Sequence, residues 1–246
     1  MVFDAEVTRS LDALRAAHLT TGELRASLQT VADATCALFD ADGAGVMLLD
    51  EQQALHYVSS TSNEAAALEA AQEETGEGPC VDSIIFDEVV MTSDVMTDRR
   101  WPRLRQAATD MGVGAVMGAP IRLGGTAVGS LNTYRVERYR WTSRDIDAIT
   151  AHGRVVEELI GAALLAGQRN EIVDQLNRAL ESRVTIERAI GVVMGRDGVD
   201  PVRAFDRLRR VARSERRKVS EVAQDVLADD AYSPPTVIPV GGEEQK

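Results

Sequence analysis

Basic side chains gather near the C-terminal end of a chain that is otherwise acidic. The formal net charge is −12, yet residues 206–218 hold seven Arg or Lys and only two acidic residues. The segment from Arg169 to Ala228 carries a balance of +3, and the rest of the chain carries −15. Clustered arginines bind phosphates, so this segment is a candidate footprint for nucleic acid. Charge runs are also common on solvated surfaces, and charge alone does not decide between the two.

Few other residues in the chain have the types and spacing that catalysis or metal binding requires. The histidines His18, His56 and His152 show no metal-ligand spacing with one another or with the two cysteines. No Ser-His-Asp arrangement, paired-carboxylate signature or zinc motif stands out. We therefore expect no enzyme activity, no catalytic residue, no metal site and no cofactor.

The scarcity of lysine excludes several further functions. Lys218 and Lys246 are the only lysines, so the first 217 residues contain neither a P-loop nor a pyridoxal Schiff base. Asp50 ends an apolar run as a receiver phosphoacceptor does, but a receiver needs a lysine later in its own domain. His152 on a predicted helix resembles a kinase phosphoacceptor, but Gly-rich ATP-binding motifs are missing. Phosphotransfer is therefore not expected.

The number of cysteines and the lengths of the apolar runs indicate the cellular compartment of the protein. Cys36 and Cys80 are too few for a disulfide framework. Cys80 follows a Gly/Pro loop and is either a redox sensor or a packed thiol, of which we favour the packed thiol. No apolar run approaches the roughly 18 residues of a membrane span, and the start lacks a secretory pattern. We expect a cytoplasmic protein that does not contact membrane.

The first two thirds of the chain alternate between helical and strand-like patterns. Helical spacing covers about 4–39 with a break near Thr20-Thr21-Gly22, and a Gly-Gly turn follows Leu123 as in hairpins. Ser143 is a suitable N-cap for a helix running to about Ala166. These patterns predict an α+β fold with a largely antiparallel sheet flanked by helices. The other helices are expected at 63–73 and 101–111, and the strands at 45–49, 55–58, 89–91, 113–121 and 127–134.

Three amphipathic helices are predicted after about residue 168. Apolar residues recur at helical spacing up to Met194, and Gly195 and Gly198 are expected to end that helix. Asp200 followed by a proline is an N-cap for a second helix, and a third begins at about Val219. Such helices can bury one another's apolar faces in a small all-α three-helix bundle.

Both parts resemble known families. Residues 21–165 are similar to a GAF domain in the order of elements and in the motifs Gly76-Glu77-Gly78-Pro79-Cys80, Ala119-Pro120-Ile121 and Gly129-Ser130-Leu131-Asn132-Thr133-Tyr134. That resemblance implies a sensory domain that binds an unidentified small molecule or mediates dimers. The C-terminal helices resemble an ANTAR domain through Ser182-Arg183, Ile186-Glu187, Ala189, Gly191, Met194, Ala204-Phe205, Leu208-Arg209, Ala212, Lys218-Val219 and Val222-Ala223.

The ANTAR resemblance implies binding to paired RNA hairpins in a leader transcript and transcription antitermination. Ile190 stands where many members have lysine, and Arg216 stands where asparagine is common. These departures affect contact geometry and target sequence more than the identity of the module. Arginine and lysine near the helix junctions are the predicted RNA-binding residues. They are Arg183, Arg188, Arg209, Arg213, Arg216, Arg217 and Lys218.

The predicted organisation is an N-terminal helix at 1–20, a GAF-like sensory domain at 21–166, an ANTAR-like domain at 167–228 and a disordered tail at 229–246. Coupling is expected along the helix from Ser143 towards Met194, as a continuous dimeric coiled coil or with a hinge near Gly167. We expect a homodimer. Two other functions stay open, a DNA-binding helix-turn-helix regulator built on 200–227 and a protein-interaction adaptor. Against the DNA reading, Glu221 and Asp225 leave the third helix acidic.

Overall fold

The computed structural model describes residues 5–17, 19–20, 23–50, 55–167, 171–215 and 217–228, except for the side chains of Asp110 and Arg213. His18, part of the predicted break at 20–22, Arg216 and the predicted tail at 229–246 lie outside these residues. The elements before the bundle are α1 (Ala5–Ala16), α2 (Leu24–Leu38), β1 (Gly43–Leu49), β2 (Leu55–Ser60), α3 (Asn63–Thr75), α4 (Pro79–Phe86), β3 (Val90–Thr92), α5 (Pro102–Ala108) with a 3-10 turn (Thr109–Met111), β4 (Ala115–Leu123), β5 (Thr126–Arg135) and α6 (Ser143–Leu165).

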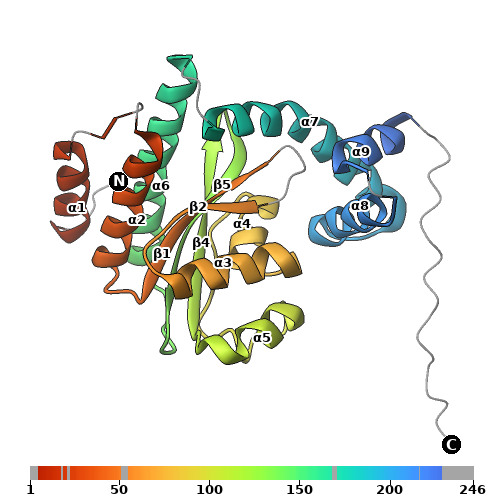
Figure 1. Ribbon diagram of the computed structural model, residues 1–246. Coiled ribbons are helices and arrows are strands. Elements are labelled where there is room, and N and C mark those ends of the chain that lie inside the picture. Colours follow the sequence, from red (N-terminus) through yellow and green to blue (C-terminus); the bar gives the residue numbers. More distant parts are fainter. Residues whose placement is uncertain are drawn as a thin grey trace, which may run out of the picture.

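A five-stranded antiparallel sheet forms the centre of this sheet domain, which comprises α1 to α6 (Figure 1). The strand order is β2-β1-β5-β4-β3, and each neighbouring pair is antiparallel. Gly124 and Gly125 form the β4–β5 turn with φ of 59° and 86°, values that glycine adopts without strain. The α+β prediction with its antiparallel sheet and closing hairpin is confirmed.

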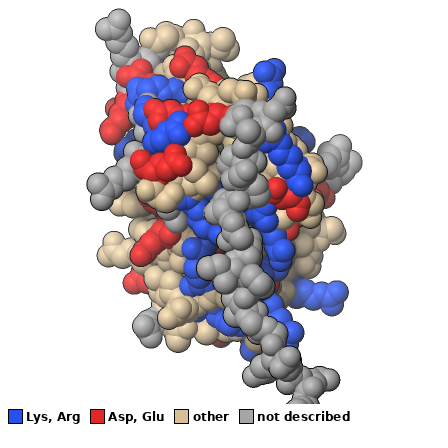
Figure 2. All heavy atoms as spheres, turned by 90° about the vertical axis from the view of Figure 1, so that its right-hand side faces the viewer, with Lys and Arg blue, Asp and Glu red and all other residues tan. Residues whose placement is uncertain are grey.

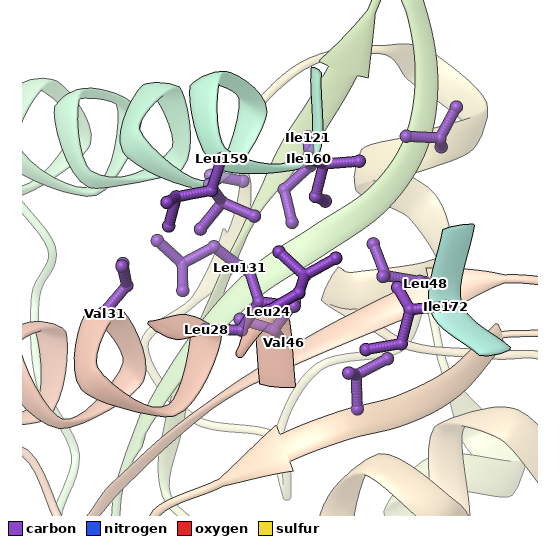
Figure 3. Close-up of a cluster of buried hydrophobic side chains, with 14 of the residues drawn as sticks. Leu24, Leu28, Val31, Val46, Leu48, Ile121, Leu131, Leu159, Ile160 and Ile172 are labelled. Carbon is purple, nitrogen blue, oxygen red and sulfur yellow. The ribbon is translucent and has the colours of Figure 1, made fainter. Parts of the chain in front are cut away.

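Helices cover both faces of the sheet. On one face α2 and α6 pack against the strands, and their apolar side chains form the main core (Figures 1 and 3). Leu28, Ile160 and Leu131 are fully buried in that core. On the other face α3 and α4 contact the strands, and α5 packs on α3. Pro79 occupies the first turn of α4, where a missing N–H has no cost.

The N-terminus of α6 corrects one prediction. Thr142, not Ser143, is the N-cap: its hydroxyl accepts from the Asp145 N–H at 3.3 Å. The Asp145 carboxylate accepts in return from the Thr142 N–H at 2.7 Å, which completes a capping box. Ser143 is the first residue inside the helix. Thr142 and Ser143 both carry a hydroxyl that can cap a helix. Asp145 lies three residues after Thr142, so only Thr142 can form the capping box with it.

A buried histidine ties α1, α2 and α6 together. The Thr35 hydroxyl donates to the Val31 carbonyl at 2.8 Å, so Nδ1 of His152 is the donor to Thr35 across 2.9 Å. Nε2 then accepts from the Ser10 hydroxyl at 3.1 Å. Burial lowers the pKa of His152 to about 4. This histidine is therefore a neutral packing residue that holds three helices in register.

The C-terminal bundle consists of α7 (Glu171–Asp197), α8 (Pro201–Glu215) and α9 (Val219–Ala228). Its core contains Ile186, Phe205, Leu208 and Val222. Gly198 ends α7 with φ of 62°, whereas Gly195 lies inside the helix, so the expectation that both glycines end it is wrong for Gly195. The all-α three-helix bundle is confirmed.

The chain changes direction between α6 and α7 (Figure 1). Helix α6 ends at Leu165, and Gly167 has φ of 61°, a left-handed conformation that does not continue an α-helix. Val173 and Leu176 at the start of α7 join the same core as Leu159 of α6. The Gln175 amide donates to the Leu49 carbonyl at 3.2 Å. Helix α7 thus begins on the sheet domain and ends in the bundle.

Candidate nucleic-acid interface

Helix α8 is the main source of positive charge in the bundle. It contains five arginines in 15 residues, and its apolar side packs into the bundle core through Phe205 and Leu208. The side chains of Arg203 and Arg210 are 76% and 61% exposed. Arg207, in contrast, is 20% exposed and forms an ion pair with Asp197 at the end of α7. The helical period therefore presents Arg203 and Arg210 to solvent.

Neither Arg203 nor Arg210 was among the predicted RNA-binding residues. The signal that identifies them is their place on the helix relative to Phe205 and Leu208, because neither falls on the apolar side. Each contacts one carboxylate: Nε of Arg203 lies 3.5 Å from Asp200, and Nε of Arg210 lies 3.1 Å from Asp206. Such exposed pairs contribute little to stability and open readily to a competing phosphate.

Arg217 lies at the α8–α9 junction among three carboxylates. Its Nη1 is 2.6 Å from Asp225 and 2.9 Å from Glu215, and its Nε is 3.6 Å from Glu221. Hydrogen bonds to Asp225 and Glu215 raise the pKa of Arg217 above its ordinary value. The sequence predicts Arg217 as an RNA-binding residue, and in the structure its ion pairs link α8 to α9.

Arg183 faces the sheet domain. Its side chain is 5% exposed, its Nε donates to Glu187 at 2.8 Å, and its Nη2 donates to the Ile84 carbonyl of α4 at 3.3 Å. An arginine in such a position satisfies a main-chain acceptor and seals the junction between two parts of the chain. Arg183 is therefore separated from the exposed arginines of α8.

Arg209 also points towards the sheet domain. Its guanidinium lies 5.7 Å from the ring centroid of Phe205 and close to the α3–α4 loop, since a Cβ on Gly76 would lie 2.4 Å from Nη1. Gly76 has φ of 65° and ends α3. Glycine at this position gives the left-handed cap and leaves room for the arginine.

The other predicted RNA-binding residues are Arg188, Lys218, Arg213 and Arg216, and the structure describes the side chains of the first two. Arg188 is exposed on α7 and has no paired carboxylate among the described residues. Lys218 is exposed before α9, and its carbonyl accepts the Glu221 and Val222 N–H groups. The side chain of Arg213 and all of Arg216 lie outside the described residues. Lys and Arg side chains gather in the lower half of the face shown in Figure 2.

A second group of polar side chains is buried beneath the sheet, between β1, β5 and α3. Asn132 donates to Oε1 of Glu69 at 3.4 Å and accepts from Ser130. Glu69 is 2% exposed, and its Oε2 has no hydrogen-bond partner within the described part of the chain. Burial raises the pKa of Glu69 to about 8, so the carboxyl is protonated at neutral pH.

Cys80 lies in the first turn of α4, at the edge of this group. Its side chain is fully buried, and its Sγ accepts from the Gln72 amide at 2.8 Å. Burial, and then the Glu69 carboxyl, raise the pKa of the thiol well above its ordinary value. Both conditions oppose the exposed thiolate that a redox sensor requires.

Among the described residues, no group of three or more His, Cys, Asp or Glu side chains is arranged to hold a metal ion. No helix within the described ranges is long and apolar enough to cross a bilayer.

Comparison with family models matches two segments of the chain. Residues 23–160 match the GAF domain, and residues 174–227 match the ANTAR domain. The GAF match runs from α2 into α6, and the ANTAR match spans most of α7, the whole of α8 and all but the last residue of α9. No curated protein matches the chain.

Solved structures share the fold of the sheet domain. The GAF domain of a phosphoenolpyruvate-protein phosphotransferase from Coxiella burnetii matches with a TM-score of 0.52 at 15% identity, covering 66% of this chain and 94% of that one. Free methionine-R-sulfoxide reductase from Neisseria meningitidis, in complex with its substrate, matches with a TM-score of 0.53 at 16% identity, covering 68% and 98%. At these identities the likeness concerns the fold alone.

Proposed function

Because the chain belongs to the GAF domain family and also contains an ANTAR domain, we propose that it is an RNA-binding transcription antitermination regulator. ANTAR domains bind RNA, and GAF domains are sensory. The observation that carries the proposal is the ANTAR match over a three-helix bundle whose middle helix holds five arginines. The target is a pair of hairpins in a leader transcript, and binding prevents the terminator from forming.

Four exposed cations of the bundle are the proposed RNA ligands. They are Arg188, Arg203, Arg210 and Lys218, with the contribution of Arg213 and Arg216 resting on the sequence alone. Sequence-specific RNA recognition favours unpaired loop nucleotides, where arginine stacks on bases and binds phosphates. Arg183 and Arg209 instead hold the bundle against α4 and the α3–α4 loop.

The sensory role rests on the contacts between the two domains. Ile85 of α4 packs against both the bundle core and the apolar cluster beneath the sheet. A small molecule that shifted α4 would therefore move the surface on which Arg183 and Phe205 rest. We propose an unidentified small-molecule ligand of the GAF domain as the signal.

A homodimer is the proposed assembly. A groove of about 620 Å³ runs between α1 and α6, where Leu11, Leu14, Val155 and Leu159 line it beside the charged Arg15, Arg154 and Glu158. Leu165 at the end of α6 is 92% exposed and adds apolar surface that a second copy would cover. Two copies that paired along α6 would cover this side and bring two ANTAR domains to two hairpins.

We propose no enzymatic activity. One structure of similar fold is that of a sulfoxide reductase. A cysteine that took part in catalysis would have to be accessible to its substrate. Cys80 is fully buried and Cys36 is half-buried on α2, so neither is presented in an open site. The cytoplasm is the proposed location, because it holds nascent transcripts.

The decisive experiment begins with RNA crosslinked to the protein in its host. Transcripts recovered in this way are tested for retardation by the purified chain and for readthrough of a leader terminator in transcription with purified components. Binding with increased readthrough supports the proposal. Preference for duplex DNA over the recovered RNA would favour a helix-turn-helix regulator, and no nucleic-acid binding at low salt would favour a protein-interaction adaptor.

A further inference from the structure

A groove of about 540 Å³ separates α8 from the GAF domain. Its walls come from the α3–α4 loop, the end of α4, the segment that leads into α5, and one side of α8. Arginines line it from both domains: Arg99, Arg100 and Arg103 from the GAF domain, and Arg203 and Arg209 from the ANTAR domain. The RNA-binding residues proposed above all belong to α7, α8 and the α8–α9 junction, so the GAF side of this groove has no role yet.

The carboxylates in the groove are already engaged. Glu77 accepts from Nε of Arg103 at 2.8 Å, and Asp206 pairs with Arg210 at 3.1 Å. Asp200 accepts the Arg203 N–H at 2.9 Å as the cap of α8. Asp82 accepts from the Trp101 indole at 2.8 Å, and burial raises the pKa of this carboxyl to about 6. The groove lining holds five arginines and these four carboxylates, so its balance of charge is positive.

Two of the arginines retain the capacity to bind a further anion. Arg99 is exposed and has no ion pair or hydrogen bond among the described residues. The Arg203 side chain is 76% exposed and only loosely paired, at 3.5 Å. The two guanidinium groups approach the groove from opposite domains, which suits a backbone of regularly spaced phosphates.

An aromatic side chain lies in the same groove. Phe86 ends α4 and is 41% exposed, although a phenylalanine at a helix end is usually covered. An exposed aromatic ring among arginines is the combination that binds single-stranded nucleic acid, because bases stack on the ring and phosphates pair with the guanidinium groups.

We propose that this groove is part of the RNA-binding surface, with Phe86 stacking a base of an unpaired hairpin loop and Arg99 and Arg203 binding the phosphates beside it. The inference rests on the proposed function and extends it. The GAF domain then contacts RNA directly, so a displacement of α4 relative to α8 alters the site itself as well as the orientation of the ANTAR domain.

Site-specific crosslinking tests the aromatic contact in the full chain. Phe86→p-benzoylphenylalanine is irradiated with a labelled transcript pool that carries two hairpins with randomised loops. The matched control is Tyr57→p-benzoylphenylalanine, because Tyr57 is 52% exposed on β2 and does not line the groove. We expect an RNA adduct at position 86 and none at 57. Retardation of the pool without an adduct at 86, or equal adducts at both positions, would overturn the inference and leave the proposed function standing.

Charge reversal tests the phosphate contact. Arg99→Glu should weaken binding of the same pool about 5- to 10-fold and lower the slope of log affinity against log salt by about 1. The control is Arg140→Glu, since Arg140 is an exposed arginine of the same domain outside the groove and has no ion pair among the described residues. Equal losses in both variants would show a general charge effect and overturn the site. A wild-type chain that retards neither the pool nor crosslinked transcripts would instead overturn the proposed function, and this inference with it.

Discussion

The guanidinium of Arg183 donates a hydrogen bond to the carbonyl of Ile84 across 3.3 Å, although 99 residues separate them in the chain. This bond joins the first helix of the ANTAR domain to α4 of the GAF domain. The side chain is 5% exposed, so the contact is shielded from water and from RNA. Arg183 therefore stabilises the contact between the two domains.

Arg183→Met is expected to loosen that junction. The variant keeps an apolar stem of similar length but removes the charged donor, a loss of about 1–3 kcal/mol for a buried hydrogen bond to charge. Hydrogen exchange of α4 and α8 amides should become faster, whereas RNA affinity should stay within about 2-fold. A loss of affinity of tenfold or more without faster exchange would show that Arg183 contacts RNA.

Arg203 and Arg217 are expected to differ in their importance for RNA binding. Arg203 is exposed and loosely paired, whereas Arg217 is surrounded by Asp225, Glu215 and Glu221. Arg203→Ala should weaken hairpin binding about 3- to 10-fold, and Arg217→Ala should change it less than about 2-fold. Fluorescence anisotropy at several salt concentrations measures both. A larger loss of affinity in Arg217→Ala than in Arg203→Ala would mean that Arg217 leaves its three carboxylates when RNA binds.

The sequence predicts the elements of this protein better than the environment of its charged side chains. Hydrophobic periodicity and the Gly124-Gly125 turn lead to the antiparallel sheet and the three-helix bundle, because each element is encoded over a short stretch. The cap of α6 was missed by one residue, since Thr142 and Ser143 are equally suitable by type.

The candidate site was less accessible to sequence reasoning. Residue type and local charge lead to the prediction that Arg217 and Arg183 bind RNA. Folding, however, brings Asp225 to Arg217 and the Ile84 carbonyl to Arg183. Helix phase relative to Phe205 would have identified Arg203 and Arg210. The groove at Phe86 is formed by segments that are far apart in the chain, so no local sequence pattern predicts it.

Glu69 makes the folded chain less stable as pH rises. Its pKa is about 8 in the folded state and 4.5 ordinarily, so the folded state binds the extra proton between these values. The contribution of Glu69 to the free energy of unfolding is complete below pH 4.5. It is lost as the pH rises through 8, at up to about 1.4 kcal/mol per pH unit. Glu69→Gln should therefore be more stable than wild type at pH 8, with the difference vanishing near pH 4.5.

Urea unfolding at several pH values measures this difference. The control is Glu64→Gln, because Glu64 is exposed on the same helix and its variant should track the wild type. A Glu69→Gln chain that is no more stable at pH 8 than at pH 5, relative to wild type, would contradict a protonated Glu69.

His152 should act in the opposite direction. Its pKa is about 4 in the folded state and 6.5 ordinarily, so the unfolded chain binds the extra proton between these values. Stability from the neutral imidazole is complete above pH 6.5 and is lost as pH falls towards 4, at up to about 1.4 kcal/mol per pH unit. His152→Gln should remove this slope in urea unfolding. An unchanged slope in the variant would place the acid sensitivity elsewhere.

The two cysteines are expected to differ in reactivity, and this difference separates a packed Cys80 from a redox-active one. Cys80 is fully buried and bonded to the Gln72 amide, whereas Cys36 is half-buried and donates to the Ala41 carbonyl at 3.2 Å. Only a thiolate in contact with solvent is alkylated rapidly, and burial raises the pKa of both thiols. With N-ethylmaleimide at pH 7.5, we expect mass spectrometry to find Cys36 labelled first and Cys80 labelled only after denaturation. Rapid labelling of Cys80 in the folded chain, or a sulfenic acid at Cys80 after mild peroxide, would reinstate a redox role for the GAF domain.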